Sequence, residues 1–425
     1  MKDSMWFSIP PSKSILNRLL IIQSFSIAGK NLDLNWCSNF DGLAEDSQLM
    51  IQAIKDLHSG IHSFNVGQAG TVLRFLAIRL SRETGTFTLY GHPRLFERPQ
   101  AELALIIEKL GGQAKLFSDS MTIISRGWKP VDELVVAGKD SSQFLSAVLL
   151  SAWNLDFDLN LRLVGNLVSA SYLEMTVNCL KKLGMEVKGQ GLGEILIPKK
   201  QSLSNIREDS SLLRSLIEPD MSSLFAVLAA KIVSQPEVEF FVPSASIQPD
   251  HEFTQILEQV GHLDFKEEIQ FESSDWQMLH WKRRSGQNSK LIKVDLNRSP
   301  DLAPVLAVVL AILGIHFQFI GAQHLVHKES NRIQKTAELL SKIGFGVEIN
   351  KDGFTMIGKN EGKGDGGSAA EGQNDLAVEF DADHDHRMAM AAGIAMKAGY
   401  KVKILGVDSV KKSLPDFWKL IGVSP

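Results

Sequence analysis

Hydrophobic residues recur at helical spacing along much of the chain, and several of these segments begin beside a residue that can cap a helix. In PPSKSILNRLLIIQ, the apolar positions Ile15, Leu16 and Leu19 lie on one helical face, and Ser12 is a good N-cap. Lys13 therefore lies in the first helical turn, where the helix dipole is positive and backbone N–H groups lack partners. A cation in this place predicts an anion that shares the site.

The longest apolar stretch, LAPVLAVVLAILGIHFQFI, is long enough to span a bilayer. Four residues interrupt it, namely Pro304, Gly314, His316 and Gln318. The interruptions predict a buried helix followed by a strand instead of a membrane span.

A helix that ends in glycine and leads into a strand-like run occurs repeatedly, as in IIEKLGGQAKLF and LLSKIGFGVEI. Glycine suits the left-handed conformation that ends many helices. A looser copy, AIKDLHSGIHSF, precedes the others, which gives six helix ends in all. A spacing of about eighty residues predicts six β-α-β-α-β-β blocks. The alternative is a chance coincidence of common helix ends. The other five glycines are Gly111, Gly184, Gly261, Gly344 and Gly422.

The composition is that of a soluble globular protein, with 44% hydrophobic and 22% charged residues, and 425 residues are enough for two domains. The formal charge of −4 disfavours nucleic acid and anionic membranes as partners, because both require a basic surface. Cys37 and Cys179 have no metal-binding spacing, which indicates buried thiols in a reducing compartment. No charged segment precedes an apolar core at the N-terminus, so we expect a cytoplasmic protein.

Cations and hydroxyls stand at the start of further predicted helices. Lys328 and Arg332 are spaced i, i+4, which predicts that they share a helical face, and Arg98 precedes Pro99, a proline of the N1 type. Each of these signals is commonplace alone, but together they predict a cationic pocket for phosphates and a carboxylate. The remaining residues of this kind are Arg74, Ser141, Ser142, Ser169, Tyr172, His386, Arg387, Lys412 and Ser413. Gly70, one turn before Arg74, would let a ligand approach the backbone.

Other phosphate-binding motifs are absent from the sequence. GKNEGKGDG does not have P-loop spacing, and GQGLG is not a dinucleotide fingerprint. The segment DADHDH, residues 381–386, could bind a divalent metal, although alternating residues before a helix more often act as caps. Asp301 and Glu329 are candidates for proton transfer, with N-capping and ion pairing as their respective alternatives.

Taken in order, ten motifs resemble the 5-enolpyruvylshikimate-3-phosphate (EPSP) synthase family. The resemblance extends almost from end to end of the chain. It implies a transferase that moves the enolpyruvyl group of phosphoenolpyruvate to the 5-hydroxyl of shikimate 3-phosphate, through a tetrahedral adduct and with release of phosphate. This reaction belongs to the shikimate pathway, which leads to chorismate and the aromatic amino acids. The motifs are PPSKSILNR, AGTVLRFL, PRLFERP, SSQFLSA, SASYLEMT, PDMSSLFA, SPDLAPVLA, HKESNRI, DHRMAMA and KKSLPDF.

The resemblance implies an α/β fold with two similar domains, each built of three β-α-β-α-β-β units as an inside-out α/β barrel, that close about a two-strand hinge. We expect residues 13–216 to form the domain with the shikimate 3-phosphate site. Residues 1–12 and 217–425 would form the domain with much of the phosphoenolpyruvate site. The Gly-rich segment 358–375 is expected to be a flexible insertion. No metal or cofactor is implied, and we expect a monomer.

Carried over position by position, the resemblance also implies roles for single residues. Asp301 would take the proton of the attacking hydroxyl, and Glu329 and Lys13 would move protons to and from the methylene carbon. The contacts to shikimate 3-phosphate would be Ser14, Arg18, Ser141, Ser142, Ser169, Tyr172, Asp301 and Lys328. The contacts to phosphoenolpyruvate would be Lys13, Gly70, Arg98, Gln143, Arg332, Arg387 and Lys412.

The chain also departs from the family pattern. Pro11 replaces the usual glycine before the first motif, and Phe75 replaces the proline that usually follows Arg74. Ala170 and Ser171 replace a Lys-Pro pair, which removes one positive charge near the expected phosphate. All charged residues assigned to chemistry are present, so we expect activity. The other departures are three replacements of asparagine, by Gln68, His324 and His384.

Two alternative functions remain open. A sister enzyme transfers enolpyruvyl to UDP-N-acetylglucosamine, but it usually carries a reactive cysteine in the loop that matches TLYGHPRLFERP, where this chain has none. A non-catalytic homologue that binds a phosphorylated ligand is the other alternative. Pro11 and Ala170 favour it, whereas the presence of Lys13, Asp301 and Glu329 disfavours it.

Overall fold

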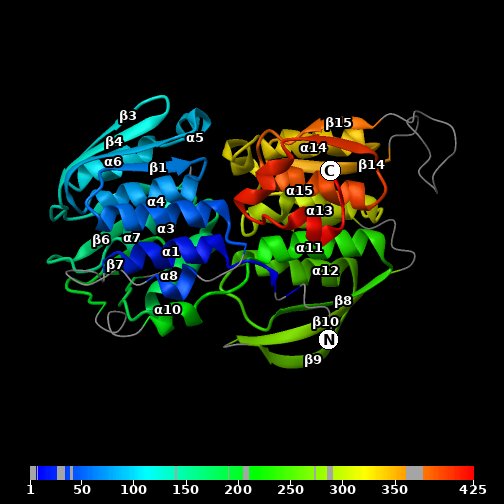
Figure 1. Ribbon diagram of the computed structural model, residues 1–425, viewed down its shortest axis with the longest axis horizontal. Coiled ribbons are helices and arrows are strands. Elements are labelled where there is room, and N and C mark those ends of the chain that lie inside the picture. Colours follow the sequence, from blue (N-terminus) through cyan, green and yellow to red (C-terminus); the bar gives the residue numbers. More distant parts are fainter. Residues whose placement is uncertain are drawn as a thin grey trace. The chain divides into compact units, whose positions relative to one another are not determined.

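The chain forms two compact units, shown in the computed structural model of Figure 1. The N-terminal unit comprises Pro10–Asp220 and Ile247–Pro249, and the C-terminal unit comprises Met1–Ile9, Met221–Ser246 and Asp250–Pro425. The expected ranges were 13–216 for one domain, and 1–12 with 217–425 for the other. The segment Ile247–Pro249 belongs to the N-terminal unit, although it lies in the range expected for the other domain. Of the expected insertion 358–375, residues 360–375 lie outside the described residues. The structure describes residues 6, 8–25, 34–38, 42–138, 141–189, 191–203, 210–271, 274–284, 291–359 and 377–425.

Three buried helices form the centre of the N-terminal unit. They are α1 (Lys13–Gln23), α4 (Gly70–Leu80) and α7 (Ser142–Leu150), and they pack against one another. Almost all their side chains are buried, because each carries apolar residues on most of its surface. The predicted cap of α1 is confirmed, since the Ser12 hydroxyl accepts a hydrogen bond from the Ile15 amide. The helix α8 (Ala170–Lys182) packs against α7 and α1.

Two separate sheets accompany these helices. One has the order β1-β2-β4-β3, with β1 parallel to β2 and the other pairs antiparallel, and the second has the order β5-β6-β7. The strands are β1 (Ser63–Gly67), β2 (Thr84–Gly91), β3 (Gln113–Leu116), β4 (Ser120–Arg126), β5 (Leu134–Ala137), β6 (Leu159–Val164) and β7 (Glu194–Ile197). The remaining helices of this unit are α2 (Asn35–Ser38), α3 (Glu45–His58), α5 (Pro93–Glu97), α6 (Ala101–Lys109) and α10 (Ser211–Ser215).

The C-terminal unit also has three mutually packed buried helices, α11 (Met221–Ser234), α13 (Ala303–Ile312) and α15 (His386–Lys397). The prediction for residues 302–320 is confirmed, because α13 is buried and is followed by β12 (Phe317–Ile320). Within the described ranges, we find no helix with the length and apolar character needed to cross a membrane.

Three sheets belong to the C-terminal unit, with the orders β8-β10-β9, β11-β12-β14-β13 and β15-β16. No sheet closes into a barrel in the described part of either unit. The strands are β8 (Glu237–Pro243), β9 (Gly261–Phe271), β10 (Ser274–Arg283), β11 (Ile292–Asp295), β13 (Phe345–Asn350), β14 (Gly353–Lys359), β15 (Val378–Asp381) and β16 (Val402–Leu405). The other helices are η2 (Pro249–Glu252), α12 (Phe253–Val260), η3 (Pro300–Leu302), η4 (Gln323–His327), α14 (Arg332–Lys342), η5 (Val407–Lys412) and α16 (Phe417–Ile421).

The predicted β-α-β-α-β-β order occurs in both units. Residues 63–126 run β1, α4, β2, α5, α6, β3, β4, with the short α5 as an addition, and residues 292–359 run β11, α13, β12, α14, β13, β14. Four of the five predicted helix-ending glycines have positive φ, as expected. Gly261 is the exception, because it is extended with φ −150° and starts β9. Glycine is needed there because a Cβ would lie 2.0 Å from Nε1 of Trp281.

The segment that precedes α1 forms an isolated antiparallel β-bridge with the segment that precedes α11, with Pro11 opposite Pro219. The Ser12 amide donates to the Glu218 carbonyl (2.8 Å), and the Asp220 amide donates to the Pro10 carbonyl (2.9 Å). The Glu218 carboxylate also accepts from the Ile247 amide, at 3.1 Å, and so connects the short third segment to this pair. These contacts lie within the N-terminal unit, next to the points where the chain passes between the units, at residues 9–10 and 220–221.

Candidate functional site

The candidate residues gather where the buried helices begin. In the N-terminal unit, α1 begins at Lys13, α4 begins at Gly70 and α7 begins at Ser142. In the C-terminal unit, Asp301 lies in η3, directly before α13, and Arg387 is the second residue of α15. Because helix starts present unpaired N–H groups and a positive dipole end, both clusters favour anions.

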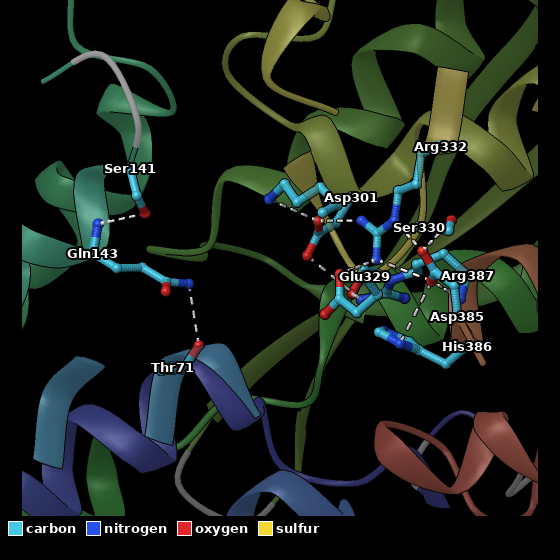
Figure 2. A network of polar contacts seen from close by, with 12 residues as sticks. Thr71, Ser141, Gln143, Asp301, Glu329, Ser330, Arg332, Asp385, His386 and Arg387 are labelled. Carbon is cyan, nitrogen blue, oxygen red and sulfur yellow. Dashed lines mark hydrogen bonds and ion pairs between the residues drawn. The ribbon is translucent and has the colours of Figure 1, made fainter. Parts of the chain in front are cut away.

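The start of α7 is connected to α4 by polar side chains. The Ser141 hydroxyl caps α7 by accepting from the Gln143 amide (3.2 Å), and the Gln143 side chain donates to the Thr71 hydroxyl (3.2 Å) (Figure 2). Arg74, which is 3% exposed, donates to Ser141 Oγ (3.3 Å) and to Gln143 Oε1 (2.9 Å). The capping prediction for Ser141 is therefore confirmed, and Arg74 adds a buried cation beside it.

Arg18 is almost fully buried on α1, with 2% of its surface exposed. Among the described residues, its guanidinium donates to neutral oxygens only: the Ser14 carbonyl (2.6 Å), the Tyr172 carbonyl (3.1 Å) and the Thr176 hydroxyl (2.7 Å). Burial lowers the pKa of Arg18 to about 10. The structure thus brings together Ser14, Arg18 and the backbone of Tyr172, as the predicted list requires.

Gly70 lies against Arg98. A Cβ at position 70 would meet Arg98 Nη1 at 2.9 Å, so any larger residue there would require the Arg98 guanidinium to shift. The Nε of Arg98 is buried, and no described residue accepts a hydrogen bond from it. Lys13, the first residue of α1, forms an ion pair with Asp46 of α3 (3.3 Å).

Ser142 and Ser169 both stand at helix starts. Ser142 is the first residue of α7 and is 3% exposed. Ser169 precedes α8 in a left-handed conformation, with φ 55° and ψ 45°, and its side chain does not cap the helix. A non-glycine residue in this conformation is strained, and such strain is common at ligand-binding sites.

Arg332 is the centre of the C-terminal cluster, part of which Figure 2 shows. Ion pairs join six of the predicted residues there, namely Asp301, Lys328, Glu329, Arg332, Arg387 and Lys412. Arg332 donates to Asp385 from Nε (2.8 Å), to Asp301 from Nη1 (2.8 Å) and to Glu329 from Nη2 (3.0 Å). Burial alone would lower the pKa of Arg332, but these three carboxylates raise it well above its usual value. Arg332 is therefore a permanent cation that holds three carboxylates in place.

Asp301 is surrounded by cations. Besides Arg332, Lys328 Nζ lies 3.5 Å from Oδ1 and Arg387 Nη2 lies 3.9 Å from Oδ2. Burial would raise the pKa of Asp301, but Lys328, Arg332 and Arg387 outweigh it and hold the pKa below its ordinary value. Asp301 is consequently an ionised hydrogen-bond acceptor at neutral pH. The capping alternative for this residue is wrong, since its side chain caps neither η3 nor α13.

Two further cations complete the cluster. Lys412 Nζ forms an ion pair with Glu329 (3.0 Å), so Glu329 lies between Lys412 and Arg332. Arg387, 1% exposed, donates to the Ser222 hydroxyl at the start of α11. Its Nε and Nη1 are buried, and no described residue accepts from them. Arg387 therefore presents buried donors that an anion would satisfy.

The structure corrects two predictions of local geometry. Lys328 does not share a helical face with Arg332, because α14 begins only at Arg332 and Lys328 is extended after η4. The two residues meet through Asp301 instead. The N1 proline is Pro93 of α5, whereas Pro99 lies before the Gln100 cap of α6.

The structure also shows residues that the sequence alone did not assign. Asp385 accepts from the Ser330 hydroxyl (3.0 Å), from Arg332 and from the Arg387 amide (2.9 Å). Its place before an apolar helix indicated only a cap, which is confirmed. His324 lies close to the charged cluster, where burial and Lys328 lower its pKa to about 3. No local signal distinguished Asp46, Thr71 or Thr176.

The side chains of residues 381–386 do not form a metal-binding group among the described residues. In the described ranges, no group of three or more histidine, cysteine, aspartate or glutamate side chains is placed to hold a metal ion. The left-handed residues Asp383 and His384 lead directly into the cap instead, with φ 53° and 55°.

Comparisons with known proteins agree over nearly the whole chain. A family model described as EPSP synthase (3-phosphoshikimate 1-carboxyvinyltransferase) matches residues 37–421. The 3-phosphoshikimate 1-carboxyvinyltransferases of Methanoculleus marisnigri and Clostridium novyi are both 27% identical to the chain. The alignments cover 98% and 97% of this chain and 95% and 93% of the relatives, respectively.

Solved structures show the same fold. An EPSP synthase from Acinetobacter baumannii matches 97% of this chain and 94% of its own, with a TM-score of 0.65 and 20% identity. The enolpyruvyl transferase NikO from Streptomyces tendae matches 97% of this chain and 93% of its own, with a TM-score of 0.59 and 11% identity.

Proposed function

The chain belongs to the EPSP synthase family, and we propose that it transfers the enolpyruvyl group of phosphoenolpyruvate to the 5-hydroxyl of shikimate 3-phosphate, releasing phosphate. The family match over residues 37–421 carries this proposal. The structure supports it because the charged residues that the resemblance assigns to the substrates fall into two clusters, and each cluster presents buried cationic donors.

Shikimate 3-phosphate carries a phosphate, a carboxylate and hydroxyls. In the proposal, the phosphate binds to the hydroxyls at the starts of α7 and α8, where helix dipoles favour anions. Arg18 and Ser14 contact the ring substituents. The residues proposed for this substrate are Ser14, Arg18, Ser141, Ser142, Ser169, Tyr172, Asp301 and Lys328.

Phosphoenolpyruvate carries a carboxylate and a phosphate, so its site requires several cations. Arg387 and Arg98 support the assignment, because each has a buried nitrogen that no described residue satisfies. An anion that accepts these hydrogen bonds would remove the penalty of buried unpaired donors. The residues proposed for this substrate are Lys13, Gly70, Arg98, Gln143, Arg332, Arg387 and Lys412.

The proposed chemistry forms one bond between the 5-hydroxyl oxygen of shikimate 3-phosphate and C2 of phosphoenolpyruvate. The hydroxyl proton passes to Asp301, and Glu329 or Lys13 delivers a proton to the methylene carbon, which completes the tetrahedral adduct. Removal of a proton from the new methyl group, together with breaking of the C–O bond to phosphate, then gives the product. The cations stabilise negative charge on the departing phosphate.

The surroundings of Asp301 suit the first step in a particular way. Because the cations hold its pKa low, Asp301 is ionised and can accept the hydrogen bond of the hydroxyl at neutral pH. The same cations make it a weak base, so the proton moves only as the new C–O bond forms and the hydroxyl becomes acidic.

The direct test is phosphate release by the purified protein in the presence of a chelator, with phosphoenolpyruvate and one acceptor at a time. We expect release with shikimate 3-phosphate and none with UDP-N-acetylglucosamine. Release only with the second acceptor would assign the sister activity. Binding of shikimate 3-phosphate without any release would indicate the non-catalytic homologue.

The variant Asp301→Asn tests the assigned base. It keeps the size of the side chain but removes the negative charge, and we expect kcat to fall about 10²-fold to 10⁴-fold. Asp275→Asn, at an exposed position of β10, is the matched control and should leave kcat unchanged. A near-normal kcat for Asp301→Asn would remove Asp301 from the mechanism.

A further inference from the structure

Phe75 stands where the family pattern has proline, and the proposed function gives it no role. It lies in the middle of α4 and is fully buried. Its ring faces the guanidinium of Arg18, with Arg18 Cζ at 5.2 Å from the ring centroid. This distance lies within the range of a cation–π interaction, which is strongest when both partners are removed from water.

The hydrogen bonds of Arg18 do not use all the N–H donors of its guanidinium. Nε donates to Thr176, Nη1 donates to the Ser14 carbonyl and Nη2 donates to the Tyr172 carbonyl. Each terminal nitrogen carries two hydrogens, so one N–H on each of them has no acceptor within the described residues. Two such N–H groups on one guanidinium match the two oxygens of a carboxylate.

The chemistry of the neighbours explains why these donors remain available. A carboxylate beside Arg18 would occupy the fork, but no described carboxylate lies within ion-pair distance of it. The ring of Phe75 stabilises the cation through its face and accepts no in-plane hydrogen bond. It therefore compensates part of the buried charge without competing for the donors.

We propose that Phe75 is a positioning residue, which holds the Arg18 guanidinium so that its two remaining N–H groups bind the carboxylate of the acceptor substrate. The inference rests on the proposed function, which supplies shikimate 3-phosphate as the acceptor. Thr176 fixes the third side of the guanidinium, and the Ser146 hydroxyl accepts from Thr176 in turn (2.9 Å). The Phe75 ring and the Thr176 hydroxyl together fix the plane of the Arg18 guanidinium and its rotation within that plane.

The test replaces Phe75 with 3,4,5-trifluorophenylalanine, which keeps the shape of the ring but withdraws negative charge from its face. Affinity for shikimate 3-phosphate is measured by titration calorimetry without phosphoenolpyruvate, so the result does not depend on turnover. We expect Kd to rise about threefold to thirtyfold. With an acceptor analogue that has a carboxamide in place of the carboxylate, fluorination should change Kd less than twofold.

Phe75→Leu gives a second measurement, with Phe64→Leu at a fully buried position of β1 as the matched control. We expect a higher KM for shikimate 3-phosphate only in Phe75→Leu, with kcat and the KM for phosphoenolpyruvate within about twofold of the wild type. Equal effects of fluorination on both acceptors, or no effect on either, would overturn the inference. If the wild type releases no phosphate, the proposed function fails, and the calorimetric comparison still decides the role of Phe75.

Discussion

Arg18 in the N-terminal unit and Arg332 in the C-terminal unit are both almost fully buried, but their charges are compensated by different groups. Arg332 contacts the carboxylates of Asp301, Glu329 and Asp385. Arg18 contacts two carbonyls, one hydroxyl and a phenylalanine ring. The first cation is needed to hold its neighbours together, whereas the second keeps its charge available for a ligand.

The difference separates two uses of a buried cation. In the C-terminal cluster, four cations face three carboxylates, so the cluster carries one net positive charge and the ion pairs hold the carboxylates in defined positions. Around Arg18, no carboxylate of the part of the chain that the structure describes supplies the opposite charge. A substrate anion can therefore contribute more to neutralising Arg18 than to neutralising Arg332.

The largest expected effect comes from removing each arginine in turn. Arg332→Met leaves three carboxylates without their shared partner, and we expect the free energy of unfolding to fall by about 3–5 kcal/mol. Arg18→Met removes a buried charge that has no carboxylate, so we expect a loss below about 1 kcal/mol. Urea denaturation followed by circular dichroism measures both values. Equal losses would show that the two cations are compensated alike.

A smaller effect is expected from acid. His324 titrates near pH 6.5 when unfolded, but burial and the cations Lys328 and Arg332 lower its native pKa to about 3, against the opposite effect of Asp301. The unfolded state therefore binds more protons below pH 6.5, and stability falls as the pH falls toward 3. We expect a loss of about 2 kcal/mol between pH 7.5 and 5.

The variant His324→Asn should remove this part of the pH dependence, as measured by urea denaturation at each pH. His327→Asn, at an exposed position of the same 3-10 turn, is the matched control and should retain it. An unchanged pH dependence in His324→Asn would show that burial and the nearby cations do not lower the pKa of His324 in the native state.

The smallest expected effect concerns Gly70→Ala. The new Cβ would meet Arg98 Nη1 at 2.9 Å, and the flexible guanidinium would have to shift by a few tenths of an ångström. We expect the KM for phosphoenolpyruvate to rise about tenfold, corresponding to about 1.4 kcal/mol, with Kd for shikimate 3-phosphate unchanged. Gly193→Ala, where the Cβ meets no atom within 4 Å, is the control. A rise in both constants would show that the substitution disturbs the Arg18 region as well.

Local sequence signals predicted many helix starts correctly, because a cap and its acceptor are only two or three residues apart. Each of three caps accepts a hydrogen bond from a backbone amide two or three residues later in the chain, namely Ser12, Ser141 and Asp385. The same signals failed at Pro99, where the helix begins two residues later than the proline implied. They also failed at Gly261, where a close contact with Trp281 of a neighbouring strand explains the glycine.

The candidate residues were predicted from ordered motifs, but their partners were not. Arg332 and Asp385 are 53 residues apart, and Arg18 and Thr176 are 158 residues apart. No spacing rule connects such positions, since they meet only when separate helices pack. The i, i+4 spacing of Lys328 and Arg332 wrongly predicted a shared helical face, because the helix begins only at Arg332. Both side chains nevertheless contact Asp301.

The sequence by itself determined the family, many helix starts and the order of elements in residues 63–126 and 292–359, together with the residue types proposed to bind two anionic substrates. These depend on periodicity, caps and motifs, all of which are written in short segments of the chain. Only the tertiary structure decided which group compensates each buried cation, carboxylates for Arg332 and a ring with neutral oxygens for Arg18. Compensation depends on distance in space, because both the Coulomb energy and the desolvation of a charge are set by what packs around it.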